Sequence, residues 1–92
     1  MKLMQLRYFS AVCHLGGVTR AAERLHVSQP AITAAIQNLE DELGLLLLSR
    51  GGRTLVPTLD GEAFLARCDG ILTEVEGLTA DFQARSQRRD RK

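Results

Sequence analysis

Three residues spaced four apart, Gln29, Thr33 and Gln37, carry side chains that can hydrogen-bond to the edges of DNA bases. On a helix they would lie close together, because residues four apart are neighbours on its surface. A glutamine amide can make two bonds to an adenine edge, and a threonine can reach a phosphate or offer its methyl group to thymine. The alternative is that these residues form an ordinary solvated polar face. The secondary structure predicted around them distinguishes this alternative from a DNA-binding face.

Residues 18–44 predict two short helices separated by a break at His26-Val27. Apolar residues recur at helical spacing in both segments, which gives each helix one face for a core. Ala21 and Ala22 are small enough to let two helices cross closely at a short turn. The pattern therefore predicts a helix-turn-helix, whose apolar stripes are Val18, Ala21, Ala22 and Leu25 on the first helix and Ile32, Ile36, Leu39 and Leu43 on the second.

The second of these helices begins with residues that favour an exposed, well-defined end. Ser28 is a preferred N-cap, because its hydroxyl accepts a backbone N–H of the first turn. Pro30 lies within that turn, where its missing donor costs nothing, although it also disfavours helical geometry at Gln29. Val27 and Ile32 occupy the positions of a hydrophobic staple. We expect this end to enter a DNA groove, where the N–H groups of a helix start favour a phosphate.

Two short apolar runs, residues 45–48 and 54–56, predict a β-hairpin after this helix. They flank a Gly-Gly pair, which is a hairpin-turn signal because both glycines accept positive φ. Pro57 limits the second strand, as expected of an edge. The hairpin would place Arg50 and Arg53 where guanidinium groups can meet phosphates or a narrow minor groove. The alternative is two surface arginines that flank a loop.

The segment from residue 58 to residue 84 predicts one long helix. Thr58 is a good N-cap candidate, and Asp60 and Glu62 favour the positive end of a helix. Apolar residues then alternate three and four apart, and a second row seven apart widens the stripe. Packing against its own domain could hide part of this face but not its distal half, so we predict a homodimer joined through residues 60–82. The predicted interface residues are Phe64, Leu65, Cys68, Ile71, Leu72, Val75, Leu78 and Phe82.

Charge divides the 92 residues into three parts, although the net charge is only +1. Residues 1–57 hold six basic and four acidic side chains, residues 58–84 one and six, and residues 85–92 five and one. The acidic part coincides with the predicted dimer helix, so the DNA face is expected to be locally positive. The basic tail has few apolar residues and is predicted to be disordered. We expect a DNA-binding domain over 1–57, a linker helix over 58–84 and a tail over 85–92.

The order of these elements resembles the N-terminal DNA-binding domain of the LysR family of bacterial transcriptional regulators. The resemblance covers approximately residues 3–65 and is carried by LRYFSAV, AAERLHVSQPAIT, IQNLEDELG and LLLLSRGGR. It implies a mainly α fold, a winged helix-turn-helix of three helices plus a short β-hairpin wing, followed by a long linker helix that pairs two subunits. It further implies binding to interrupted palindromes as dimers, or as tetramers in the full-length protein. Family members usually continue into a domain that binds a small-molecule effector, and no such domain is predicted within these residues.

By this resemblance, the positions that face the groove in the family are Gln29, Pro30, Thr33, Ala34 and Gln37. Ala34 stands where many members carry a longer polar or basic side chain, which leaves a thymine methyl group as its natural contact. Gly17-Val18 replace a common Ser-Phe pair, which removes a hydroxyl cap from the helix that follows. The resulting DNA-binding residues are Ser28, Gln29, Pro30, Thr33, Ala34, Gln37 and the wing arginines Arg50 and Arg53.

Other classes of function find little support in the sequence. No nucleophile–base pattern, phosphate loop or paired-carboxylate arrangement is present, so an enzyme is not expected. His14 and His26 have no spacing that makes them metal ligands, and no cofactor is predicted. Cys13 and Cys68 are expected to behave as small buried hydrophobes in a reducing cytoplasm, and no apolar run suggests a membrane span. A protein-interaction module without DNA stays an alternative, whereas RNA binding lacks a stacking platform because aromatic residues are few.

Overall fold

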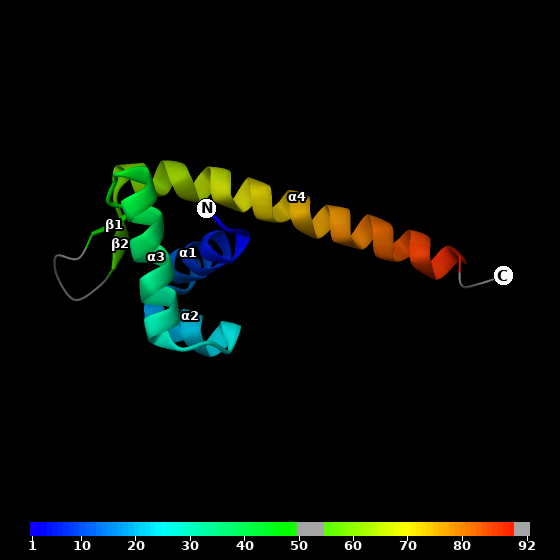
Figure 1. Ribbon diagram of the computed structural model, residues 1–92, viewed down its shortest axis with the longest axis horizontal. Helices are drawn as coiled ribbons and strands as arrows, with labels where there is room; N and C mark the ends of the chain where they lie inside the picture. Colours follow the sequence, from blue (N-terminus) through cyan, green and yellow to red (C-terminus); the bar gives the residue numbers. More distant parts are fainter. Residues whose placement is uncertain (50–54, 90–92) are drawn as a thin grey trace.

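Three short helices form a head from which a fourth, much longer helix projects (Figure 1). The computed structural model describes residues 1–49 and 55–89. The molecule measures 58 × 25 × 19 Å because the long helix extends well beyond the head. This arrangement confirms the predicted mainly α winged helix-turn-helix with a long final helix. In order, the elements are α1 (Leu3–Leu15), α2 (Val18–Leu25), α3 (Gln29–Leu43), β1 (Leu48–Ser49), β2 (Val56–Pro57) and α4 (Leu59–Arg89).

The core of the head is formed by the apolar stripes of its helices. Phe9 of α1 and Ile32 and Leu39 of α3 are fully buried. Ala21 of α2 is also fully buried, as expected for a small residue at a close helix crossing. The predicted faces of α2 and α3 therefore form the core, except that Leu25 at the end of α2 does not take part in it.

The turn between α2 and α3 has the predicted geometry. His26 adopts the left-handed conformation with φ 57°, and its backbone N–H donates to the carbonyl of Ala22. Ser28 caps α3 by accepting the N–H of Ala31 at 3.2 Å. Pro30 does not delay the helix, which begins at Gln29. The break and the cap are thus confirmed.

The β-hairpin is shorter than predicted, because only two residues on each side are paired. Leu48 pairs with Pro57 and Ser49 with Val56 in an antiparallel ladder. The prediction of a strand over 45–48 is wrong for its first three residues, whose backbone bonds elsewhere: the N–H of Leu47 donates to Glu40 Oε2 at 2.8 Å, and its carbonyl accepts from the N–H of Thr58 at 3.0 Å. The predicted hairpin tip with Arg50 and Arg53 lies outside the described residues.

The beginning of α4 is held tightly against the connection between α3 and β1. The hydroxyl of Thr58 accepts the N–H of Gly61 at 2.9 Å and donates to the carbonyl of Leu46 at 2.6 Å. The predicted N-cap is therefore confirmed. A Cβ atom at Gly61 would collide with the Leu47 carbonyl oxygen, so only glycine fits at this crossing.

The first turns of α4 pack against α1, and part of the predicted dimer seam takes part in this packing. Cys68 is only 1% exposed and donates its thiol hydrogen to the Leu6 carbonyl at 3.2 Å. The Phe64 ring meets the Phe9 ring edge to face, with centroids 5.5 Å apart. Four predicted interface residues thus pack on the core of their own chain, so the core continues past the predicted boundary at residue 57. They are Phe64, Leu65, Cys68 and Leu72.

The end of α4 also differs from expectation. The helix continues to Arg89, so the predicted disorder of the tail is wrong for residues 85–89. Arginine, glutamine and alanine are good helix formers, and Arg88 and Arg89 in the last turn stabilise the negative end of the helix. Across residues 1–49 and 55–89, no helix combines the length and the apolarity that crossing a bilayer requires.

Candidate nucleic-acid interface

The outer face of α3 is presented to solvent because its opposite face is locked into the core. Ile32, Ile36 and Leu39 are each at most 2% exposed, which fixes the rotation of the helix about its axis. The six predicted groove residues of this segment then lie together on the surface. All of Ser28, Gln29, Pro30, Thr33, Ala34 and Gln37 are exposed.

One of these side chains is already oriented by a neighbour. The Gln37 amide donates from Nε2 to Asp41 Oδ1 at 3.1 Å, one helical turn further along. The amide keeps its carbonyl oxygen and a second N–H for other partners. The Asp41 carboxylate would repel a phosphate, so a nucleic-acid contact is favoured on the part of α3 that precedes it.

The first turn of α3 offers few backbone donors to a phosphate. Pro30 has no N–H, and the N–H of Ala31 is occupied by the Ser28 hydroxyl. A phosphate at this helix start would therefore depend mainly on side chains, and less on backbone N–H groups than the sequence predicts. The start of α2 is different, because its N-cap, Gly17, provides no side-chain cap. The adjacent residues Thr19 and Arg20 are exposed.

The base of the hairpin lies beside the outer face of α3. Thr33 shares a small hollow of about 60 Å³ with Val18 of α2 and with Leu48 and Leu55 near the two strands. The starts of α2 and α3 and the hairpin base thus meet on one side of the head. Arg50 and Arg53, predicted to extend this surface, lie outside the described residues.

Glu40 is a structural residue that sequence reasoning missed. It stands with Asp41 and Glu42 in an acidic run at the far end of α3, yet it is only 4% exposed. Its Oε2 accepts the N–H groups of Leu47 at 2.8 Å and Leu48 at 3.3 Å, which ties α3 to β1. A signal was present, because Glu40 follows Ile36 by four residues and so falls on the apolar face.

The two cysteines lie at the contact between α1 and α4. Burial raises the pKa of the Cys13 and Cys68 thiols to about 11, and the negative charge of Asp69 adds to this shift. Both thiols therefore stay protonated at neutral pH and are poor nucleophiles. No cluster of three or more metal-ligating side chains occurs among the described residues.

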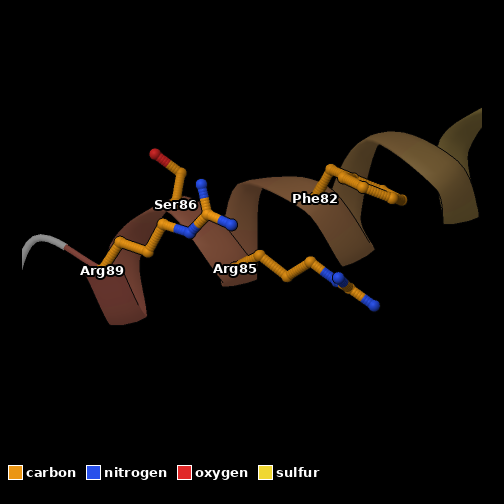
Figure 2. A pocket seen from close by; sticks show the side chains of 4 residues that line it. All are labelled: Phe82, Arg85, Ser86 and Arg89. Atoms are coloured by element: carbon orange, nitrogen blue, oxygen red, sulfur yellow. The ribbon is translucent and has the colours of Figure 1, made fainter.

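Within residues 1–49 and 55–89, no part of the head covers the apolar surface of distal α4. Ile71, Leu78 and Phe82 are 45%, 61% and 56% exposed, and Val75 is partly exposed. Figure 2 shows Phe82 with Arg85 extending alongside it, and the Arg85 guanidinium lies 5.0 Å from the ring centroid. These four apolar residues are the part of the predicted dimer seam that does not pack on the core of the head, and we call them the distal apolar face.

Comparisons with known proteins cover nearly all of this structure. Residues 3–62 match a family model described as bacterial regulatory helix-turn-helix protein, lysR family. The HTH-type transcriptional regulator TcbR of Pseudomonas sp. (strain P51) is 44% identical over 90 residues, which are 98% of this chain and 30% of that protein. The Hca operon transcriptional activator HcaR of Escherichia coli (strain K12) is 45% identical over 76 residues, 83% of this chain and 26% of that protein. This chain thus spans at most about a third of the length of these curated relatives.

The fold of this chain is also similar to that of solved structures of related proteins. The BenM_DBD/catB site 1 DNA complex superposes with a TM-score of 0.89 at 37% identity, covering 94% of this chain and 97% of that one. The CbnR_DBD–DNA complex superposes with a TM-score of 0.81 at 44% identity, covering 95% of this chain and 99% of that one. The long helix and the head therefore have matched counterparts in both structures.

Proposed function

This chain belongs to the lysR family of bacterial regulatory helix-turn-helix proteins, and from that premise we propose that it binds double-stranded DNA sequence-specifically as a homodimer. It would serve as the DNA-binding part of a transcription regulator rather than as an enzyme. The observation that carries the proposal is the outer face of α3, which is exposed from Ser28 to Gln37 while Ile32 and Ile36 are buried beneath it. A recognition helix needs this division between an anchored face and a presented one. The DNA complexes named for BenM and CbnR support it further.

In this proposal the part of α3 from Gln29 to Gln37 enters the major groove. Gln29, Thr33 and Gln37 read base edges, because their amide and hydroxyl groups both donate and accept hydrogen bonds. Ala34 packs on a thymine methyl group, and Pro30 offers apolar contact at the helix start. Ser28 contributes mainly by fixing that start.

Phosphate contacts flank the groove in this arrangement. The start of α2, with Thr19 and Arg20, approaches one DNA strand, because the first helix of a helix-turn-helix crosses the backbone. The hairpin, through Arg50 and Arg53, reaches a phosphate or the minor groove on the other side of α3. These contacts fix the position of the protein on the duplex, whereas the residues of α3 choose the sequence.

The distal apolar face pairs α4 with α4 of a second copy. The six acidic residues of this helix lie between Asp60 and Asp81, and all its basic residues except Arg67 lie from Arg85 onward. An antiparallel pair places the basic end of each helix beside the acidic part of the other, whereas a parallel pair would bring like charges together. We therefore propose an antiparallel dimer, in which residues 58–84 act as the linker helix.

Two-fold symmetry then matches an interrupted palindrome. The two copies of α3 would face half-sites roughly 34 Å apart, or a multiple of that distance. A tetramer and a small-molecule effector belong, in this proposal, to a longer protein in which further domains follow this chain. Its place of action would be the bacterial cytoplasm, on the nucleoid.

Selection of bound duplexes from a random pool tests the proposal directly. We expect an enriched half-site repeated with two-fold symmetry, and we expect affinity to fall steeply with added salt because phosphate contacts release counterions. Fluorescence anisotropy with the selected duplex and a scrambled duplex of equal composition measures both properties. An Arg53→Ala variant should weaken binding to both duplexes and flatten the salt dependence. Enrichment of no sequence, together with binding that salt does not affect, would contradict the proposal and favour a protein-interaction module.

A further inference from the structure

A hydrogen-bonded cluster of three side chains joins α1 to α4 where the long helix leaves the head. Ser10 Oγ donates to Asp69 Oδ1 at 2.7 Å, and His14 Nε2 lies 2.7 Å from Asp69 Oδ2. A carboxylate only accepts, so the imidazole donates from Nε2. Each oxygen of Asp69 thus has its own donor, and both donors come from α1.

The geometry of this cluster fixes the Asp69 carboxylate in two directions. Ser10 and His14 are one turn apart on α1, so the two bonds resist both sliding and rotation of α4 against it. Burial raises the pKa of Asp69, but the hydrogen bonds from Ser10 and His14 outweigh it and the net shift is downward. The side chain is therefore ionised at neutral pH, where its hydrogen bonds are strongest.

Asp69 is one of several α4 residues that attach the long helix to the head, and it lies near the end of that segment. Thr58 and Gly61 hold the start of α4, and Cys68 is buried against α1. From Thr58 to Asp69 this segment is about 16 Å long, at 1.5 Å per residue. In the core of the head, Leu72 is the last α4 residue that takes part. The direction of the projecting helix is consequently set between Thr58 and Leu72, and Asp69 lies close to the outer end of that span.

Resting on the proposed DNA-binding dimer, we propose that Asp69 is a positioning residue that sets the angle between the head and α4, and thereby the half-site spacing that the dimer accepts. The projecting part of α4 acts as a lever arm. The helix from Asp69 to Phe82 is about 20 Å long, so a rotation of about 10° moves its end by about 3.4 Å. That displacement equals the rise of one base pair. Loss of this one contact therefore allows each head to bind a half-site that is displaced by one base pair.

The decisive experiment compares spacing profiles on DNA. The wild-type chain first selects its duplex, and affinities are then measured for that duplex, for versions with one or two base pairs added or removed at the centre, and for one isolated half-site. We expect wild type to lose about tenfold in affinity for each altered spacing, and Asp69→Ala to lose less than about threefold. On the isolated half-site the two proteins should be equal, because the outer face of α3 is unchanged.

Matched variants separate positioning from general stability. Glu76→Ala removes an acid seven residues further along α4, on the same side of the helix but beyond the head, and should keep the wild-type profile. Asp69→Asn keeps an acceptor for Ser10 and should be intermediate. A Ser10→Ala/His14→Ala double variant leaves Asp69 in place and should reproduce the broadened profile of Asp69→Ala. A wild-type profile in both Asp69→Ala and the double variant would overturn the proposal.

A second readout does not depend on DNA. Residual dipolar couplings of backbone amides report the orientation of α4 relative to α1–α3. We expect one common alignment for head and helix in wild type and two different alignments in Asp69→Ala. Unchanged couplings in Asp69→Ala would overturn the proposal, even if that variant lost DNA binding for another reason. Absence of any duplex bound by wild type would instead contradict the proposed function, and the couplings would still decide whether Asp69 fixes the angle.

Discussion

The buried carboxylate of Glu40 accepts the backbone N–H of Leu47 at 2.8 Å, and this bond joins the end of α3 to the beginning of the hairpin. The same oxygen accepts the N–H of Leu48 at 3.3 Å. One acidic side chain thus satisfies two consecutive backbone donors where the hairpin begins. The hairpin takes its position relative to the proposed recognition helix from this residue.

Replacement of Glu40 should therefore destabilise the head strongly. Glu40→Ala leaves buried backbone N–H groups without this acceptor, and we expect a loss of about 2–4 kcal/mol in the free energy of unfolding. Glu40→Gln retains a carbonyl acceptor and should lose less. Urea denaturation followed by circular dichroism measures both. The matched control is Glu42→Ala, whose exposed ion pair with the N-terminal amine should contribute at most about 1 kcal/mol; equal losses at the two positions would contradict the assignment.

Two glycines of α4 should respond in opposite directions to the same substitution. Gly61→Ala forces a methyl group into the Leu47 carbonyl, and we expect a destabilisation of about 1–3 kcal/mol. Gly70→Ala meets open space within a helix and should stabilise the chain by about 0.5–1 kcal/mol. Thermal denaturation of the two variants beside wild type gives the comparison. A stabilised Gly61→Ala variant would show that α4 does not approach the head as closely as described.

Gln29 should contribute to the sequence specificity of DNA binding and very little to the affinity for non-specific DNA. We expect Gln29→Ala to lose about 1–3 kcal/mol of binding free energy on the selected duplex and almost nothing on a scrambled one, because only base contacts distinguish the two. Gln83→Ala serves as control, since Gln83 is an exposed glutamine on distal α4. Anisotropy titrations at one salt concentration provide the measurement. Equal losses on both duplexes would assign Gln29 to the DNA backbone instead.

The distal apolar face should stabilise the association of two copies of the chain into a dimer. A Leu78→Ala/Phe82→Ala double variant removes two exposed apolar side chains from the proposed interface, and we expect the dimer to dissociate at least about tenfold more readily. Leu59→Ala is the control, because Leu59 is 85% exposed at the opposite end of α4. Sedimentation equilibrium at micromolar concentrations separates the cases. A wild-type chain that is a stable monomer under these conditions would exclude the dimer.

The cysteines should titrate late and react slowly. Burial, with the nearby charge of Asp69, raises both thiol pKa values from 9.0 to about 11, so the thiolate is about one part in a thousand at pH 8. Alkylation of the folded chain by iodoacetamide, followed by mass spectrometry, should accelerate as the pH rises towards 11 and should increase sharply on unfolding. Because the folded values lie above the unfolded ones, the stabilisation is complete below about pH 9 and is lost as the pH rises to 11. Rapid alkylation of folded protein at pH 8 would contradict this burial.

The sequence by itself determined the elements whose signals are local. The stripes of α2 and α3, the turn at His26 and the caps at Ser28 and Thr58 all depend on residues within a few positions of one another, so they could be predicted correctly. Family motifs along the same segments then identified the winged helix-turn-helix. The exposed residues of α3 followed as well, because a helix with one apolar face presents the other.

Only the tertiary structure decided what covers each apolar face. Periodicity showed that α4 is apolar on one side, but not that Cys68 turns to α1 while Phe82 extends past the head. The donors to Asp69 lie 55 and 59 residues away from it along the chain, and the burial of Glu40 depends on where the chain returns after Gly44. A spacing pattern fixes which residues share a face, whereas the partner of that face depends on contacts between distant segments that only the folded chain brings together.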